Sequence, residues 1–233
     1  MVTSITNIAD GTAQAAAQPR AELAYQHLRK ALLEGELTPG DKISVVAVTE
    51  QLACSRVPVM EAMKRLEADG FVEIIPQVGC HVSTPIATDV VDFFNLFATV
   101  ESTVVGLAAE RRRPSEIEEF KTLCANIDNK LKLAGGPEAR DPIYRQLNLR
   151  FHSAIHAMAR SPVSTKFASS LWDRSDFYIK LAFGSLYFSK AIKKSHREMR
   201  RAIIAGDANA AKLAAFTQLQ TVGEKVTKAL SKL

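Results

Sequence analysis

From about residue 88 onward the chain carries one kind of secondary-structure signal, and that signal is helical. Apolar residues recur there at helical spacing over six stretches, which prolines and glycines interrupt. We expect helices at roughly 88–112, 115–133, 138–160, 163–185, 187–205 and 207–230. No stretch in this half alternates apolar and polar residues as a strand does. The second half therefore predicts an all-helical bundle of six or seven helices, in a protein that is mainly α.

Residues 19–84 carry a different pattern, in which short elements follow one another closely. Residues 21–34 have helical spacing, Ser44 can cap a short second helix, and Ser55 can cap a third helix that ends at Gly70. The runs "FVEII" and "CHVS" then flank the turn "PQVG". Three helices followed by a hairpin predict a winged helix-turn-helix, which is a DNA-binding architecture.

The third helix has the two faces that DNA reading requires. Its apolar stripe consists of Val59, Ala62, Met63 and Leu66, which leaves Arg56, Met60, Lys64 and Glu67 on the other side. In this motif the N-terminal residues of the helix meet the base edges, and here these are Ser55, Arg56 and Val57. Arg56 is the candidate for bidentate guanine recognition, and Lys64 is a candidate phosphate contact.

The wing favours DNA binding, whereas the charge balance of the first half counts against it. We expect Gly79 and His81 at the wing tip, where they can approach the DNA backbone or the minor groove. Residues 20–84, however, hold seven Lys and Arg against nine Asp and Glu, whereas residues 85–233 hold 23 against 15. The acidic balance of the first half counts against DNA binding, because the electrostatic footprint of such a domain is usually basic.

The N-terminus and the cysteines exclude several other classes. Residues 1–18 lack a basic segment followed by an apolar one, and no apolar run approaches the ~20 residues of a membrane helix. We expect a flexible N-terminal tail on a cytoplasmic protein without a membrane partner. The three cysteines show no CxxC spacing, so neither a disulfide framework nor a zinc ribbon is indicated.

The segments "LEGELTPGDKI" and "TEQLACSRVPVMEAMKRLEADGFVEIIPQVGCHV", with the Gly206-Asp207 turn, resemble the GntR family of bacterial transcription regulators. The resembled branch has an all-helical FCD effector domain, and the likeness covers nearly the whole chain from about residue 21. It implies a DNA-binding domain over 19–84 and an effector-binding and dimerisation domain over 85–233. It also implies a homodimer on a palindromic operator, usually a repressor, in which a bound small-molecule effector releases or repositions the two readers.

The chain departs from this family at the DNA-reading positions. The family's recognition helix usually reads Ser-Arg-Thr-Pro-Val-Arg-Glu-Ala, whereas Val57 and Met60 stand here for the threonine and the second arginine. Val78 stands where the wing usually has an arginine. We therefore expect Met60 to read a thymine methyl group or DNA shape, and we expect affinity to depend less steeply on salt than in the family.

A second departure concerns the metal site of the resembled branch. "NLRFHSAIH" places Asn148, His152 and His156 four residues apart on one helix, and His196 and Gln218 follow on later helices. The family binds a divalent metal through Asp-x-x-x-His and two later histidines, which correspond to Asn148, His152, His196 and Gln218. Two neutral amides thus replace metal ligands, so a zinc or nickel site is degenerate, with His152 and His196 as its remaining ligands, and no cofactor is required.

The effector pocket is expected to be more apolar than in relatives. Many of them carry an arginine four residues before a glutamate, and Phe97 stands at that place before Glu101. With Asn148, His152, His196 and Gln218, Phe97 suggests a pocket for an acyl, aromatic or other organic-acid effector. The alternative is that Phe97 belongs to the core. Six cations surround His196 and either meet the phosphates of an acyl-CoA or form a solvated face: Lys190, Lys193, Lys194, Arg197, Arg200 and Arg201.

Two other functional classes compete with a ligand-responsive regulator. A DNA-binding dimer without small-molecule sensing is compatible with the altered pocket. An enzyme is the less favoured alternative, because no GxSxG, GxGxxG, P-loop or HExxH motif is present, and a Cys124–His152 pair has no support from spacing. The sequence therefore predicts a DNA-binding regulator and not an enzyme.

Overall fold

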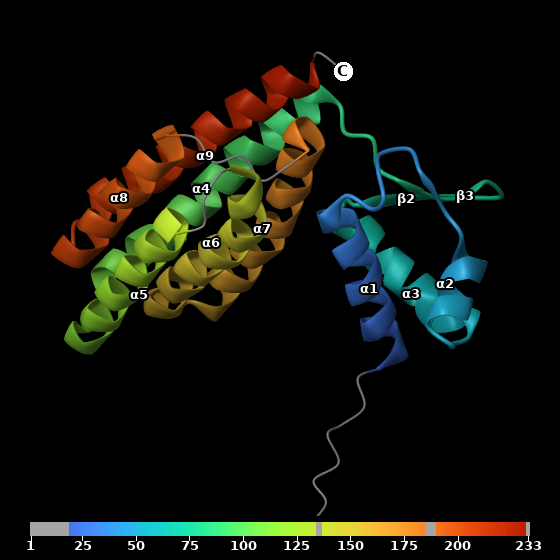
Figure 1. Cartoon of the computed structure of the whole chain (residues 1–233), viewed down its shortest axis with the longest axis horizontal. Helices are drawn as coiled ribbons and strands as arrows, with labels where there is room; N and C mark the ends of the chain where they lie inside the picture. The colour runs from blue at the N-terminus through green and yellow to red at the C-terminus, as the bar shows by residue number, and fades with distance from the viewer. Residues whose placement is uncertain (1–18, 134–136, 185–189, 232–233) are drawn as a thin grey trace, which may run out of the picture.

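The computed structural model describes residues 19–133, 137–184 and 190–231 (Figure 1). The first domain contains α1 (Arg20–Glu34), β1 (Lys42–Ile43), α2 (Val45–Gln51), α3 (Arg56–Ala68), β2 (Val72–Ile75) and β3 (Gly79–Val82). The second contains α4 (Ala87–Arg111), α5 (Pro114–Leu133), α6 (Pro137–Ala159), α7 (Pro162–Phe183), α8 (Lys190–Ala205) and α9 (Ala208–Leu230). The tail expected over residues 1–18 lies outside the described residues.

The winged helix-turn-helix is confirmed, with one strand more than the hairpin that the sequence suggested. β1 pairs with β3, which pairs with β2, so the antiparallel order is β1-β3-β2. β1 is only two residues long and has no alternating pattern, so it arises from pairing rather than from local sequence. The Ser44 hydroxyl caps α2 by accepting from the Ala47 amide at 3.2 Å. Ser55 occupies the N-cap position of α3, but its side chain makes no capping bond there.

The recognition helix α3 is amphipathic as expected. Its four predicted core residues are all fully buried: Val59, Ala62, Met63 and Leu66. α3 ends because Gly70 takes a left-handed conformation with φ 77°. The Gly70 amide then bonds to the Glu67 carbonyl and the Phe71 amide to the Leu66 carbonyl, both at 2.9 Å, which is the Schellman pattern of helix termination.

The second domain consists of helices and short connections in its described residues, and the expected helix boundaries that fall on these residues hold within about one residue. The boundaries expected at 185 and 187 lie outside the described residues. α4 and α9 run antiparallel along each other. At one end Gln220 donates to Asn95 at 2.8 Å, and at the other Lys212 pairs with Glu110 at 3.8 Å. Gly223 permits the close approach, because a Cβ there would lie 2.6 Å from that of Phe94.

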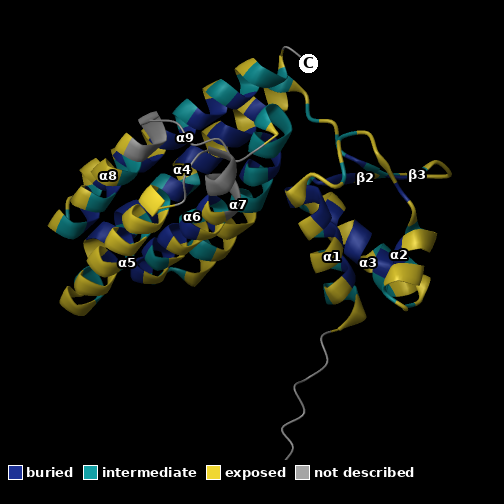
Figure 2. Ribbon diagram, in the orientation of Figure 1, coloured by how far each residue is buried: buried dark blue, intermediate teal, exposed yellow. Residues whose placement is uncertain are grey.

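One hydrophobic core joins the two domains. It combines Leu66 and Phe71 of the first domain with Phe93, Phe177 and Tyr178 of the second. Figure 2 shows buried residues between α1 and α3 and in the interior of the bundle, with exposed residues on the outer faces. The first domain is therefore docked on the second, on the side where α7 contacts α1 (Figure 1).

α4 is a long apolar helix, although no long uninterrupted apolar run is present in its sequence. By length and composition it is the one described helix that could cross a membrane. Asp92 and Glu101 interrupt its apolar residues, which is why no single run stands out in the sequence. Half of the relevant window is buried inside the protein, so packing in the bundle accounts for its apolar character.

Candidate functional site

The structure places the predicted DNA-reading residues of α3 on an accessible surface. Ser55, Arg56 and Val57 lie together at the N-terminal end of the helix, and all three are exposed. Val57 is 75% exposed, which is unusual for a large apolar side chain with no structural partner to pack on. This end of α3 thus presents a cation and an apolar group side by side, together with the free amides of a helix N-terminus.

Met60 and Lys64 lie farther along α3 and differ in exposure. Met60 is half-buried and packs against the core of the first domain, so only part of its side chain faces outward. Lys64 is exposed, one helical turn beyond Met60. The outward face therefore continues from the helix N-terminus, but Met60 is less available to a ligand than the sequence suggested.

The wing places its two predicted residues differently. The tip of the hairpin is the turn 76–78, where Gln77 has a positive φ of 63° and Val78 is 51% exposed. Gly79 begins β3 directly after it. His81 lies within β3, not at the tip, and its Nδ1 is 3.4 Å from the Gly40 carbonyl oxygen. The expected position of His81 was wrong because the turn ends at Val78, three residues before His81.

The effector residues predicted from three separate helices do converge. Asn148 and His152 of α6, His196 of α8 and Gln218 of α9 lie near one another in the bundle, and the His152 and His196 ring centroids are 5.5 Å apart. The Gln218 amide nitrogen donates to Nε2 of His196 at 2.9 Å. The Tyr144 hydroxyl donates to the Asn148 side-chain oxygen at 3.3 Å.

Phe97 belongs to the core beside this group and not to a cavity wall. It is fully buried, and its ring meets Trp172 edge to face at 5.0 Å and Phe93 at 5.8 Å. Its expected place in the pocket is therefore wrong, since it lines neither described cavity. Trp172 in turn contacts the His152 ring, with a centroid distance of 4.0 Å and the rings tilted by 42°.

Glu101 is the residue that the sequence reading missed. It is 1% exposed, its Oε1 accepts from Nδ1 of His152 at 3.0 Å, and its Oε2 accepts from Nε2 of His156 at 2.9 Å. A buried carboxylate requires partners, and the i, i+4 histidine pair on α6 supplies them. The available signal was a glutamate in the middle of the apolar helix α4, 51 residues from His152.

Burial and these hydrogen bonds set the protonation of the group. Burial alone would raise the pKa of Glu101, but the bonds from His152 and His156 outweigh it and hold that pKa at about 2. Burial lowers the pKa of His152 despite Glu101, and it lowers the pKa of His196 to about 3. Glu101 is thus an anion at neutral pH, while His152 and His196 are neutral imidazoles.

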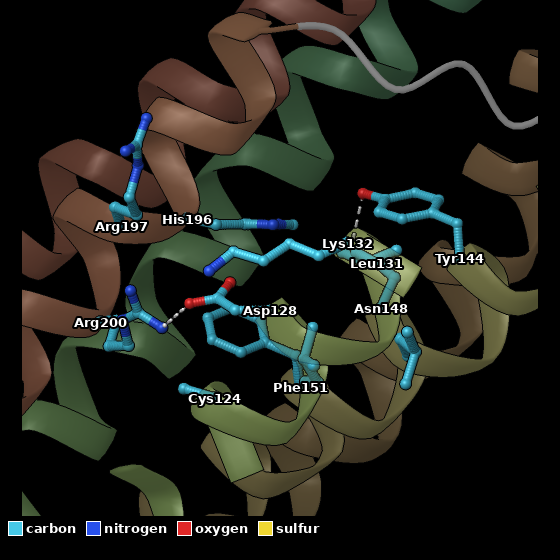
Figure 3. A pocket seen from close by; sticks show the side chains of 12 residues that line it. Cys124, Asp128, Leu131, Lys132, Tyr144, Asn148, Phe151, His196, Arg197 and Arg200 are labelled. Carbon is cyan, nitrogen blue, oxygen red and sulfur yellow. Dashed lines mark hydrogen bonds and ion pairs between the residues drawn. The ribbon is translucent and has the colours of Figure 1, made fainter. Parts of the chain in front are cut away.

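A cavity of about 410 Å³ opens beside His196 and Asn148 (Figure 3). Its lining consists of Cys124, Ile127, Asp128, Leu131, Lys132, Tyr144, Leu147, Asn148, Phe151, His196, Arg197 and Arg200. Arg200 pairs with Asp128 at 3.0 Å. Three cations against one carboxylate leave this cavity electropositive beside an apolar wall. The side chains of Lys190 and Lys193 lie outside the described residues, and Lys194 pairs with Glu198 at 3.7 Å.

A second cavity, of about 30 Å³, lies beside the first and is lined in part by α7. Tyr144 and Asn148 line both cavities, and the smaller one is completed by Arg145, Trp172, Ser175, Asp176, Ile179, Gln218, Leu219 and Val222. Oε1 of Gln218 and Nε2 of His152 are buried without a hydrogen-bond partner among the described residues. Both atoms can accept a hydrogen bond from a bound molecule, because Gln218 Oε1 is an amide oxygen and the Nδ1 of the neutral His152 carries the ring proton that is donated to Glu101.

Both halves of the chain match known families. The profile of "Bacterial regulatory proteins, gntR family" matches residues 20–82, and the profile "FCD domain" matches residues 92–221, more than half of the chain. The chain belongs to the GntR family, in its FCD branch. The helix-turn-helix of this GntR regulator is thus the family's DNA-binding unit, and the bundle with the two cavities is its FCD domain.

Similar proteins span the same two domains. The HTH-type transcriptional regulator BphR of Paraburkholderia xenovorans (strain LB400) is 27% identical over 195 residues, which cover 80% of this GntR chain and 77% of BphR. LutR of Bacillus subtilis (strain 168) is 26% identical, with 81% and 94% covered. Among solved structures, E. coli McbR/YncC has a TM-score of 0.68 at 19% identity, covering 93% and 99%, and a GntR regulator of Rhodococcus sp. RHA1 has 0.66 at 22%, covering 89% and 97%. At these identities the structures show a shared fold.

The four positions that hold a metal in the resembled branch do not fit a zinc or nickel ion here. Asn148 and Gln218 offer neutral amides, and Nε2 of His196 already accepts from Gln218. Among the described residues, no group of three or more His, Cys, Asp or Glu is arranged to hold a metal. Only His152 keeps a free ring nitrogen, and one neutral imidazole without an anionic ligand is a weak site.

Proposed function

We propose that this GntR regulator is a cytoplasmic homodimer that binds a palindromic operator and acts as a repressor. An effector bound in its FCD domain would control its affinity for DNA. The observation that carries the proposal is the exposed N-terminal end of α3, with Arg56 and Val57, in a chain whose other domain encloses a cavity of about 410 Å³. A two-fold arrangement would present two recognition helices to two half-sites.

The residues on α3 define how the operator would be read. Arg56 is suited to donate two hydrogen bonds to a guanine, and the exposed methyl groups of Val57 suit contact with a thymine methyl group. Lys64 is suited to a phosphate. Met60 replaces a cation of the family, so this reader would release fewer counterions on binding.

The cavity defines the chemistry of the effector. Its apolar wall includes Leu147 and Phe151, and Lys132, Arg197 and Arg200 supply positive charge. Its volume lies in the range of small-molecule sites, about 300–1,000 Å³. An organic acid with an acyl or aromatic body satisfies both the apolar wall and the cations.

Binding to DNA tests the proposal directly. The purified protein would be titrated, by fluorescence anisotropy, against the DNA flanking its own gene across a salt series. We expect specific binding that Arg56→Ala weakens by about fivefold or more, since a bidentate base contact contributes about 1–3 kcal/mol. Met60→Arg should steepen the salt dependence by about one unit of log–log slope if the added guanidinium reaches a phosphate.

Lys166→Gln provides the control, because this exposed cation of α7 lies outside the reader and should change neither affinity nor slope. Weak, salt-sensitive binding that is equal for the wild type and Arg56→Ala would contradict the proposal. With an operator fragment in hand, a panel of acyl, aromatic and small organic acids separates the two regulator classes. Release or tightening of DNA supports a sensor, and an unchanged affinity throughout supports the DNA-binding dimer without sensing.

An enzymatic role has less support from the residues that could carry it. Burial raises the pKa of the Cys124 thiol to about 11, despite the neighbouring Arg200, so it stays protonated at neutral pH and is a poor nucleophile. His152 is bound to Glu101 and packed against Trp172 rather than directed at Cys124. Family and relatives' names point to DNA binding instead.

We propose further that the regulator works without a resident metal ion. Zinc or nickel should leave the melting temperature of the wild type unchanged, and chelation should not lower it, because the four family positions offer too few anionic or imidazole ligands. The matched double variant Asn148→Asp/Gln218→His restores the family ligands and should gain stability with either metal. Stabilisation of the wild type by zinc or nickel, reversed by chelation, would contradict this.

A further inference from the structure

α7 contacts the effector cavities and the DNA-binding domain with two adjacent faces. Trp172, Ser175, Asp176 and Ile179 follow one another at helical spacing and line the smaller cavity. Asp173, Phe177 and Lys180 lie on the next face and meet the first domain. α7 thus combines a cavity wall with contacts to α1 and to the end of α3.

The contacts on the DNA-domain face are specific. Arg29 of α1 forms a two-bond ion pair with Asp173, in which Nε donates to Oδ2 at 2.8 Å. The rings of Phe71 and Phe177 meet edge to face with centroids 5.6 Å apart. These contacts tie α1 and the residue after Gly70 to α7.

Arg174 contacts the end of the recognition helix itself. Its guanidinium lies so close to Gly70 that a Cβ at that position would be 2.5 Å from Cζ. Gly70 is the left-handed residue whose amide terminates α3 by bonding to Glu67. A cation at this end of a helix is favoured by the partial negative charge of its terminal carbonyl groups.

Arg174 is itself held in one orientation. Its Nε donates to the Tyr178 hydroxyl at 2.8 Å, and its guanidinium lies 5.6 Å from the Phe93 ring centroid and 5.5 Å from that of Tyr178. A planar guanidinium held by one hydrogen bond and two rings loses little further entropy on meeting Gly70. Arg174 is therefore a fixed support and not a mobile surface charge.

On the cavity face, Trp172 is the group that an occupant would displace. The smaller cavity is about the size of one water molecule, so a ligand that extends into it past Asn148 must push against its walls. The centroid of the Trp172 ring lies 4.0 Å from that of the His152 ring, and Glu101 holds His152 through a hydrogen bond from Nδ1. His152 therefore resists movement, and the displacement passes into α7.

We propose that Arg174 is a positioning residue for the recognition helix and that α7 transmits effector occupancy to it. The transmission rests on the proposed function, but the positioning of α3 does not. Trp172 and Arg174 are two residues apart on one rigid helix, so a shift or rotation of α7 at the cavity moves the guanidinium against Gly70. α3 is thereby reoriented from its C-terminal end, while the base-reading residues lie at its other end.

Hydrogen exchange tests the positioning without DNA or effector. In Arg174→Gln, the amides of residues 69–71 should exchange at least tenfold faster than in the wild type, because the C-terminal support of α3 is lost. Arg174→Lys keeps the charge without the planar stack and should give an intermediate rate. Lys166→Gln removes a cation from the same helix and should leave these amides unchanged. Equal exchange in Arg174→Gln and Lys166→Gln would overturn the positioning role.

DNA binding gives a second readout that separates positioning from direct contact. Arg174→Gln should weaken binding to the flanking DNA about tenfold with an unchanged salt slope, whereas loss of a phosphate contact lowers that slope by about one. A lowered slope, or wild-type affinity, would contradict the proposal. If the wild type binds no DNA, the proposed function is wrong. The hydrogen-exchange result still shows whether Arg174 positions α3.

The transmission has its own test, because linkage requires DNA to act back on the cavity. Trp172 is the single tryptophan of the chain, so its fluorescence reports the cavity face of α7. Saturating DNA should change its emission in the wild type and should change it much less in Arg174→Gln. Identical changes in both proteins, or no change in the wild type, would overturn the transmission through α7.

Discussion

At the scale of single residues, Glu101 organises the helical domain. A carboxylate in an apolar helix is costly unless it is paired and hydrogen-bonded, and the two histidines of α6 meet that requirement. The pairing fixes the His152 ring, which in turn supports Trp172. The histidines were recognisable from their spacing, but their partner was not, because the pairing depends on how α4 and α6 pack.

The buried histidines make stability depend on pH. The pKa of His196 is about 3 in the folded protein and about 6.5 when unfolded, so the unfolded state binds more protons between these values. The stability that neutral His196 contributes is fully present above about pH 6.5 and is lost as the pH falls. The pKa of His152 is also lowered, so this residue makes stability fall with pH in the same direction. Asp176 has the opposite effect on stability. Its burial outweighs the neighbouring Arg145 and raises its pKa to about 6, so the folded state binds the extra proton as the pH falls.

We therefore expect the free energy of unfolding to fall between pH 7 and pH 5, and to fall by about 2 kcal/mol less in His196→Gln. Urea denaturation at both pH values, for the two proteins, measures this difference. Glu101 adds a further loss only below about pH 5, since its pKa is depressed to about 2. An identical pH dependence in the wild type and His196→Gln would contradict burial of a neutral His196.

At the scale of elements, local signals placed the helices well and the wing less well. Pro and Gly punctuation located the helices of the FCD domain, and Gly70 located the end of α3. β1 was missed because two residues carry no periodicity and gain their strand geometry from pairing with β3. His81 was misplaced for a related reason, since the turn length of a hairpin decides which residue reaches its tip.

At the scale of the whole molecule, the two domains share one core, and this predicts cooperative unfolding. Hydrogen exchange of residues 56–82 and Trp172 fluorescence should report the same urea midpoint in the wild type. Phe71→Ala should cost about 3–5 kcal/mol, because Phe71 is 1% exposed and packs on Phe177. Phe167→Ala on the exposed face of α7 is the matched control, and its cost should be much smaller.

Separate midpoints for the two regions of the wild type would contradict a shared core. Cooperative docking also has a functional consequence. A DNA-binding domain on a flexible linker would be independent of the cavity, whereas the proposed transmission requires a DNA-binding domain that is packed on α7. The way Arg174 meets Gly70 has this effect only because the domains are held together.

The sequence by itself determined the two domains, the helical architecture, the recognition helix and the family, because these follow from periodicity, caps and motifs that act over a few residues. It also identified Asn148, His152, His196 and Gln218 as one group, through the resemblance. Only the tertiary structure decided that Glu101 holds the histidines, that Phe97 is core, and that α7 joins the cavity to α3. Those relations depend on side chains that lie far apart in the sequence, 51 residues for Glu101 and His152 and 144 for Arg29 and Asp173. Their contacts are set by how whole helices pack and leave no local pattern.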